Sequence, residues 1–256
     1  MLYLIGAGLK PEQISVEGLK AVAECERVFL ENYTSSYAEG GIPELEKILE
    51  KKVFPVGRKQ VEEELKQILL ISKQNNIALL IVGNVFSATT HFQIFLDAKS
   101  LGIKVKVIPG ISVFSYLGKT GLQEYKFGRI VSIPRWEENF KPTSFYDYIK
   151  TNYNLGMHTL CLLDIKKEEN YFMPITHALA QIKEIAKQKN DNFLSEAKLV
   201  ALCSLGASDE IIFSGTAEEF EKQEFNSFPQ SLIICAKPSD KELEGLQLYS
   251  QKEKKK

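Results

Sequence analysis

Short apolar runs alternate with segments of helical spacing in the first half of the chain, and this alternation constrains the fold most strongly. The apolar runs lie at residues 2–5, 28–30, 53–56, 77–82 and 105–108, and the helical spacing recurs at residues 14–23, 43–49, 61–75 and 92–98. An uninterrupted apolar run is typical of a strand buried on both faces of a parallel sheet. Ser15 is placed to cap the first helix. The alternation therefore predicts an α/β unit whose sheet is mainly parallel.

The second half of the chain has further apolar runs in a different order. Strands are expected at residues 130–133, 159–163, 199–202, 211–213 and 231–235, and helices at residues 143–149 and 175–186. The run after residue 211 lies between those of Cys203 and Cys235, which favours some antiparallel pairing. Glycines cluster near residues 112–120. We therefore expect two α/β domains, residues 1–115 with a mainly parallel sheet and residues 116–256 with a mixed sheet and a short basic tail.

The charge balance argues against nucleic acid as a partner. Lysine and arginine total 32 against 33 aspartates and glutamates, so the net charge at pH 7 is −1. Proteins that bind duplex nucleic acid usually carry a basic excess. The sequence has no apolar window of ~18 residues and no basic start followed by an apolar stretch, so we expect neither a membrane span nor a signal peptide. These features favour a cytoplasmic protein.

The four cysteines are predicted to be buried core residues rather than metal ligands, nucleophiles or disulfide partners. They are Cys25, Cys161, Cys203 and Cys235. None belongs to a C-x-x-C pair, and no histidine lies at zinc-ligand spacing from any of them. Three of them lie within apolar runs that are predicted as strands, where cysteine acts as a small hydrophobic residue. The sequence therefore predicts no metal site, and a reducing compartment fits.

Two loops after predicted strands have residues suited to a polar ligand. The first contains Gly6 and Gly8, but Pro11 stands where the dinucleotide motif G-x-G-x-x-G requires a small residue. The phosphate-binding motif G-x-x-x-x-G-K-[ST] is absent. The second loop, residues 83–91, joins a buried strand to a helix through small and hydroxyl residues. Such a loop can present backbone N–H groups and hydroxyls to a ligand, although these residues alone do not identify it.

Side chains suited to acid–base chemistry are few. His91 lies where a predicted helix begins and is expected to cap or fill its first turn, His158 precedes a predicted strand, and His177 lies on an amphipathic helix. No serine occupies a G-x-S-x-G motif, so a catalytic triad is unsupported. Asp164 follows a predicted strand, a place where aspartate more often makes a turn. His91 and Asp164 are therefore the two candidates for a proton acceptor.

Seven segments match one known family in order, from Met1 to about Lys237. They are LYLIGAGL (2–9), YTS (33–35), SATTH (87–91), GKTGL (118–122), YKFG (125–128), PTSFYD (142–147) and GMHTLCLLDIK (156–166). The chain resembles the diphthine synthases, which belong to the tetrapyrrole-methylase fold superfamily. The opening segment is common to the superfamily, whereas A-T-T-H, Y-x-F-G and H-T-L-x-x-L-D-I-K are more specific. The last segment resembles the eukaryotic branch.

The resemblance implies a fold, a cofactor and a substrate. It implies a homodimer of two-domain α/β chains that bind S-adenosyl-L-methionine in a cleft between the domains. It further implies that translation elongation factor 2 is the partner, on which a 3-amino-3-carboxypropyl-histidine is methylated to diphthine. The eukaryotic branch also methylates the carboxylate and forms diphthine methyl ester, an intermediate of diphthamide biosynthesis.

The resemblance also assigns cofactor contacts. They fall on Leu9, Asn84, Ser87, Ser112, Val113, Leu163, Leu205 and Gln230. Asn84 departs from the family pattern, which usually has aspartate there, and Gln230 departs from the usual histidine. An amide keeps a hydrogen-bonding oxygen but lacks the charge that strengthens a contact to a cation. We therefore expect weaker cofactor binding or compensation by neighbouring residues.

Two other functions stay open at this point. One is a methyltransferase of the same superfamily that acts on another small molecule, such as a tetrapyrrole. The other is a cofactor-binding or regulatory homologue whose catalysis is weakened at Asn84 and Gln230. Methyl transfer from a sulfonium requires no enzyme nucleophile, so the lack of a triad does not separate these alternatives. The basic residues most suited to a docking patch are interpreted as scattered, solvated charge: Lys126, Arg129, Arg135, Lys141 and Lys166.

Overall fold

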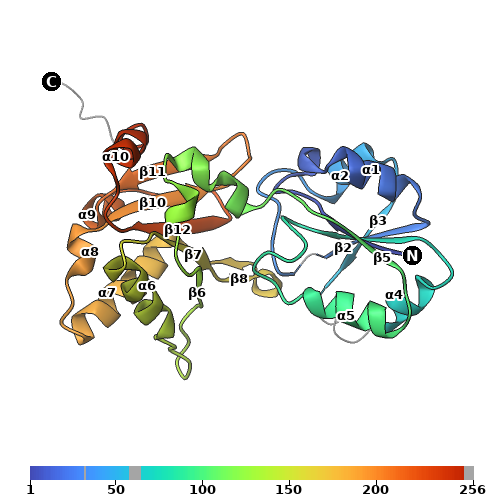
Figure 1. Ribbon diagram of the computed structural model, residues 1–256, viewed down its shortest axis with the longest axis horizontal. Coiled ribbons are helices and arrows are strands. Elements are labelled where there is room, and N and C mark those ends of the chain that lie inside the picture. Colours follow the sequence, from blue (N-terminus) through green and yellow to red (C-terminus); the bar gives the residue numbers. More distant parts are fainter. Residues whose placement is uncertain (32, 58–64, 251–256) are drawn as a thin grey trace. The chain divides into compact units, whose positions relative to one another are not determined.

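Figure 1 shows the computed structural model of the protein, which describes residues 1–31, 33–57 and 65–250. The chain divides into two compact units. The first unit comprises Met1–Ser115 together with Lys166–Asn170 and Gly206–Ser208, and the second unit contains the other described residues. Within these described ranges, every helix is too short or too polar to cross a lipid bilayer.

The first unit contains a parallel sheet, as its apolar runs predict. Its strands are β1 (Leu2–Gly6), β2 (Arg27–Glu31), β3 (Val53–Val56), β4 (Ile77–Ile81) and β5 (Val105–Ile108). They lie in the order β3-β2-β4-β1-β5, and each described pairing is parallel. Because the strands are parallel, their carboxyl ends meet at one edge of the sheet, where ligands usually bind in such folds.

Helices cover both faces of the first sheet (Figure 1). Helices α1 (Val16–Ala23) and α2 (Ile42–Leu49) lie on one face, and α4 (Leu65–Ile71) and α5 (Phe92–Ser100) lie on the other. Side chains of β1 alternate between the two cores, with Ile5 packing toward α1 and α2 and Leu4 toward α4 and α5. Ser15 caps α1 as predicted, because its Oγ accepts a hydrogen bond from the Gly18 N–H at 3.0 Å.

The helix predicted over residues 61–75 ends earlier than expected. Residues 61–64 lie outside the described residues, and the described helix α4 ends at Ile71. The Ser72 hydroxyl donates to the Leu69 carbonyl at 2.6 Å, and the Lys73 N–H donates to the Leu70 carbonyl at 3.2 Å. A side-chain donor thus takes a carbonyl that a continuing helix would use. The predicted carboxyl end at residue 75 was therefore wrong.

The second unit contains a mixed sheet, again as predicted. Its strands are β6 (Val131–Ile133), β7 (Thr159–Leu163), β10 (Lys198–Cys203), β11 (Ile211–Gly215) and β12 (Gln230–Cys235). They lie in the order β11-β10-β12-β7-β6. β6 pairs with β7 in parallel, whereas the other described pairings are antiparallel.

Helices also cover the second sheet, and some of its elements were not predicted. Helices α6 (Ser144–Asn154) and α7 (Ile175–Gln188) lie on one face and α10 (Asp240–Gln247) on the other (Figure 1). The elements without a sequence prediction are α8 (Phe193–Glu196), α9 (Ala217–Glu221), α10 and the short paired strands β8 (Ile165–Lys166) and β9 (Tyr171–Phe172). The 3-10 helices η2 (Val113–Thr120) and η3 (Glu124–Lys126) occupy the glycine-containing connection.

Candidate functional site

Three glycines follow or end the neighbouring strands β1, β4 and β5 at the carboxyl edge of the first sheet. At Gly6 and Gly110 the neighbouring backbone lies so close that a side chain would not fit. A methyl group on Gly110 would lie 2.4 Å from the carbonyl oxygen of Gly83, and one on Gly6 would lie 2.4 Å from the backbone nitrogen of Gly110. Gly83 has a φ of 82°, a conformation that favours glycine. This edge therefore presents bare backbone at the end of the sheet where ligands usually bind in folds of this kind.

The loop after β4 is connected to the loop after β5 through Asn84. Its Nδ2 donates to the Ser87 Oγ at 3.1 Å, and its Oδ1 accepts from the Gly110 N–H at 3.3 Å. Both Asn84 and Ser87 are half-buried. An aspartate could accept from the same Gly110 N–H and from the Ser87 hydroxyl, so the loop geometry accommodates either residue.

The other predicted contacts of the first unit lie around the same glycines. Leu9 follows Gly8, whose backbone exchanges hydrogen bonds with Gly83 at 3.2 and 2.7 Å. Ser112 is buried close to Gly83. Among the described residues, a methyl group on Gly83 would contact only the Cβ of Ser112, at 3.7 Å. Val113 begins η2. The structure thus brings together five of the predicted cofactor residues: Leu9, Asn84, Ser87, Ser112 and Val113.

The other three predicted contacts gather at one end of the second sheet. Leu163 ends β7, Leu205 follows β10, and Gln230 begins β12. The antiparallel register places Gln230 opposite Cys203 and Ser231 opposite Leu162, which puts all three at that end. Leu163 and Leu205 are buried and offer apolar surface and backbone groups. Their role toward a cofactor stays a prediction.

The Gln230 side chain is engaged by the protein itself. Its Oε1 accepts from the Ile175 N–H at 2.8 Å, which satisfies a free donor at the first turn of α7. Its Nε2 donates to the carbonyls of Phe225 at 2.8 Å and Ser227 at 3.1 Å. A contact from this position to a ligand would therefore come from the backbone of Gln230 rather than from its amide.

The two candidate proton acceptors differ in their surroundings. Asp164 is half-buried, and its Oδ2 accepts from the Arg135 N–H at 3.0 Å, a contact between segments 29 residues apart rather than within a local turn. His91 is buried at the N-cap of α5, where its side chain makes no capping hydrogen bond among the described residues. Its Nδ1 lies 2.8 Å from the Thr89 Oγ1, and its Nε2 lies 3.7 Å from a carboxylate oxygen of Glu31. Burial lowers the pKa of His91, and the Glu31 charge and a backbone contact with Val85 oppose that shift.

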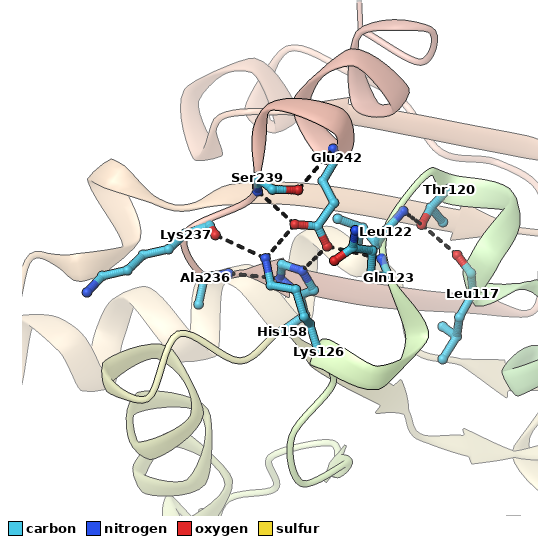
Figure 2. Close-up of polar contacts among 10 residues, drawn as sticks. All are labelled: Leu117, Thr120, Leu122, Gln123, Lys126, His158, Ala236, Lys237, Ser239 and Glu242. Atoms are coloured by element: carbon cyan, nitrogen blue, oxygen red, sulfur yellow. Dashed lines mark hydrogen bonds and ion pairs between the residues drawn. The ribbon is translucent and has the colours of Figure 1, made fainter.

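A buried cluster of charged side chains, which the sequence did not reveal, holds α10 onto the second unit (Figure 2). Glu242 Oε2 accepts from Lys126 Nζ at 2.5 Å and from the Ser239 N–H at 2.7 Å. Its Oε1 accepts from the Gln123 N–H at 3.0 Å and lies 2.9 Å from His158 Nε2. These donors hold the pKa of Glu242 well below its usual value against the opposing effect of burial. The capping-box pattern Ser239-x-x-Glu242 was the local signal that could have indicated this carboxylate.

Several residues interpreted as solvated charge have defined partners. Lys126 is only 23% exposed in its ion pair with Glu242. The guanidinium of Arg129 lies 3.4 Å from the ring centre of Tyr148, and that of Arg135 lies 4.5 Å from the ring centre of Tyr171. The interpretation as scattered solvated charge was therefore wrong for Lys126 and Arg135, which are half-buried, whereas Arg129 is exposed as that interpretation expects and stacks on Tyr148.

The cysteines are buried as predicted. Cys25, Cys161, Cys203 and Cys235 all carry free thiols. Burial raises the pKa of each thiol, to about 11 for Cys25 and about 12 for Cys203. Across the described part of the chain, no group of three or more histidine, cysteine, aspartate and glutamate side chains is arranged to hold a metal ion.

Comparison with known proteins supplies the class and then the family. The family model described as Tetrapyrrole (Corrin/Porphyrin) Methylases matches residues 1–221, which defines the chain as a methylase. The diphthine methyl ester synthase of Homo sapiens is 37% identical over 98% of this chain and 95% of its own length. That of Schizosaccharomyces pombe is 36% identical over 98% of this chain and 94% of its own length.

Comparison with a solved structure indicates the same family as the two sequence relatives. A crystal structure of diphthine synthase superimposes with a TM-score of 0.87 at 29% identity, covering 97% of this chain and 95% of that one. The chain therefore belongs to the diphthine synthase family of the tetrapyrrole methylases, and it is a methyltransferase.

Proposed function

We propose that this protein transfers methyl groups from S-adenosyl-L-methionine to the 3-amino-3-carboxypropyl-histidine of translation elongation factor 2. The product is diphthine methyl ester, an intermediate of diphthamide biosynthesis. Similarity over nearly the whole length of relatives that carry the name diphthine methyl ester synthase supports this reaction over one on a tetrapyrrole. The observation that carries the proposal is the glycine edge of the first sheet, which gathers five residues that the family resemblance assigns to the cofactor.

The donor chemistry of this edge fits S-adenosyl-L-methionine. Bare backbone at Gly83 and Gly110 lets a ligand approach the sheet closely, and the hydroxyls of Ser87 and Ser112 can donate to or accept from its polar groups. The amide oxygen of Asn84 is an acceptor, although it already receives the Gly110 N–H. When bound, the cofactor supplies an electrophilic methyl group on a sulfonium.

The protein's part in such a reaction is positioning. The acceptor nitrogen must be held in line with the methyl carbon at roughly 3–3.5 Å, a geometry that backbone and hydroxyl groups can maintain without a nucleophile. Cross-links such as Asn84 to Gly110 hold the loops of the glycine edge in place before binding. The acceptor ammonium must also lose a proton, and we propose that His91 receives it, because burial lowers the pKa of His91 and favours its neutral form.

Further assignments rest on the family resemblance. We propose that Leu163, Leu205 and Gln230 contribute to the same cofactor site, that the protein acts as a homodimer in the cytoplasm, and that residues 1–115 and 116–256 are its domains. Light scattering on the purified chain tests the dimer, since a monomeric mass would overturn it.

Calorimetry and mass spectrometry together test the proposed function. The protein is titrated with S-adenosyl-L-methionine and then incubated with elongation factor 2 that carries the aminocarboxypropyl histidine. Saturable binding and a mass gain of whole methyl groups on the modified peptide are expected. Absence of cofactor binding would instead favour a regulatory homologue, and binding without mass gain would favour another acceptor.

A further inference from the structure

A hydroxyl-rich segment follows β2 at the carboxyl edge of the first sheet. Residues 33–37 read Tyr-Thr-Ser-Ser-Tyr, so each of these five side chains carries a hydroxyl. All five residues are half-buried. β2 pairs with β4, so the segment leaves the sheet next to the strand that leads into Gly83 and Asn84. Hydroxyls both donate and accept hydrogen bonds, which suits a ligand that has both an ammonium and a carboxylate.

A buried carboxylate holds the beginning of this segment. Glu31 is the last residue of β2 and its side chain is 0% exposed. Its Oε1 accepts from the backbone N–H groups of Tyr33 and Thr34, both at 2.7 Å, and its Oε2 accepts from the Thr34 hydroxyl at 2.5 Å. A carboxylate is costly to bury unless several donors compensate it. The conformation of the segment therefore depends on Glu31.

The other end of the segment is joined to a predicted cofactor residue. The Ala38 N–H donates to the Leu9 carbonyl at 2.9 Å. The next residue, Glu39, accepts from the backbone N–H of Ser208 at 2.7 Å and from its hydroxyl at 3.0 Å. The hydroxyl-rich segment thus has both ends fixed, one of them beside the predicted cofactor loop.

Two buried polar atoms beside the segment find no hydrogen-bond partner among the described residues: His91 Nε2 and the Tyr37 hydroxyl. His91 is 1% exposed, its Nε2 lies 3.7 Å from Glu31, and its ring packs edge-on against that of Tyr33. Buried polar groups are nearly always paired, so an unpaired one calls for an explanation such as a ligand, a water or a catalytic role. Lys167 belongs to a part of the first unit that is distant in sequence. Burial lowers the pKa of Lys167, and the charge of Glu31 opposes that shift. The cluster therefore has features that fold stability alone does not require.

We propose that residues 33–37 bind the acceptor, an amino-acid-like group with an ammonium and a carboxylate, and that Glu31 is the positioning residue that shapes this segment. The inference rests on the proposed function, because the aminocarboxypropyl side chain has this chemistry. The hydroxyls of Ser35 and Ser36 contact the acceptor, whereas Glu31 acts through the backbone of Tyr33 and Thr34 and through the Thr34 hydroxyl. Cofactor binding, which belongs to the glycine edge, does not depend on the segment's hydroxyls.

Steady-state kinetics with the modified elongation factor tests this assignment. The double variant Ser35→Ala/Ser36→Ala is expected to raise KM for the acceptor about tenfold while the cofactor Kd stays unchanged, since lost hydrogen bonds of ~1.4 kcal/mol correspond to that factor. Glu31→Gln is expected to raise the same KM, with kcat at saturating acceptor less affected. Ser100→Ala is the matched control. Ser100 is exposed at the carboxyl end of α5, whereas His91 lies at the amino end of that helix, so this variant should leave KM unchanged.

The outcomes separate this inference from the proposed function. Wild-type turnover with an unchanged KM in the Ser35→Ala/Ser36→Ala variant overturns the acceptor segment and leaves the function intact. Parallel loss of cofactor affinity in that variant also overturns it, because the hydroxyls would then serve the cofactor. A wild-type enzyme that does not methylate the acceptor overturns both. Should Glu31→Gln fail to fold, the serine variant alone decides.

Discussion

Asn84 donates a hydrogen bond to the Ser87 Oγ at 3.1 Å within the loop that follows β4. The family resemblance predicts an aspartate at this position. The side-chain carbonyl oxygen of Asn84 receives the Gly110 N–H at 3.3 Å, so the amide joins two loops of the glycine edge. Asparagine at this position therefore keeps the two loops connected but lacks the negative charge of an aspartate.

Restoring that charge should strengthen cofactor binding. Asn84→Asp keeps an acceptor for both the Gly110 N–H and the Ser87 hydroxyl and adds a carboxylate close to a cationic ligand. We expect affinity for S-adenosyl-L-methionine to rise about tenfold, because hydrogen bonds to charged groups exceed neutral ones by ~1 kcal/mol or more. Calorimetry measures the change. Asn76→Asp, which adds the same charge just before the other end of β4, should leave affinity unchanged. An Asn84→Asp protein of unaltered affinity would show that this position does not face the cofactor.

Close backbone packing at the glycine edge predicts a large effect from one methyl group. In Gly110→Ala the new carbon would lie 2.4 Å from the Gly83 carbonyl oxygen. We expect the free energy of unfolding to fall by about 3 kcal/mol and cofactor binding to be lost, since overpacking forces the backbone to move. Urea unfolding and calorimetry measure the two effects.

Gly102→Ala provides the control for that substitution. Gly102 has a φ of 70°, and a methyl group there would meet nothing within 4 Å among the described residues. Only backbone strain of about 1 kcal/mol should appear, with cofactor binding kept. Equal effects of the two substitutions would mean that crowding at the glycine edge is unimportant.

The buried Glu242 cluster predicts how stability depends on pH. The pKa of Glu242 is lowered in the folded protein, so the unfolded chain binds more protons below its ordinary pKa of 4.5, and acid favours unfolding there. Burial also lowers the pKa of His158 from 6.5, and stability due to its neutral form is lost as pH falls below that value. Urea unfolding should therefore show two successive losses of stability on acidification.

Glu242→Gln removes one of these two contributions. We expect it to lower the free energy of unfolding at neutral pH by about 3 kcal/mol, because His158 and Lys126 lose their buried partner. Stability of this variant should fall less steeply than that of the wild type below pH 4.5, where other carboxylates with lowered pKa values, such as Asp191 and Glu219, still titrate. Glu244→Gln on the same helix, from an exposed pair with Lys241, should cost less than about 1 kcal/mol. If the free energy of unfolding of the variant depended on acid pH as that of the wild type does, Glu242 would not contribute to this dependence.

Thiol reactivity tests the buried cysteines. A thiol reacts as its thiolate, and burial both raises the pKa of these four thiols and shields them. The folded protein should react with a colorimetric disulfide reagent only as fast as it opens, and all four thiols should react after denaturation. Rapid reaction of even one cysteine in the folded state would contradict the structure at that residue.

Local patterns in the sequence predict much of the fold. β1 and β4 are uninterrupted apolar runs, which predicts strands covered on both faces, and Ser15 marks the beginning of α1 by its capping chemistry. These signals depend on residues close together in the chain. The end of α4 was mispredicted because the Ser72 hydroxyl competes for a backbone carbonyl, which apolar spacing does not register.

The polar clusters could not be predicted in this way. Glu242 lies 84 residues from His158 and 116 from Lys126, so only the fold brings their charges together. Glu31 directly follows the apolar run at residues 28–30, and nothing local indicates that it is fully buried or that its carboxylate accepts from the backbone N–H groups of Tyr33 and Thr34. Gln230 could be named from the family pattern, but its contacts with α7 and the loop before β12 required the structure.

Methylation of the modified elongation factor tests the central claim most directly. The purified protein is incubated with S-adenosyl-L-methionine and elongation factor 2 bearing the aminocarboxypropyl histidine, and the modified peptide is analysed by mass spectrometry before and after mild alkali. We predict a gain of methyl groups, one of which alkali removes because it is an ester while the others stay on nitrogen. An unchanged peptide mass, with the cofactor bound and the acceptor intact, would contradict the account.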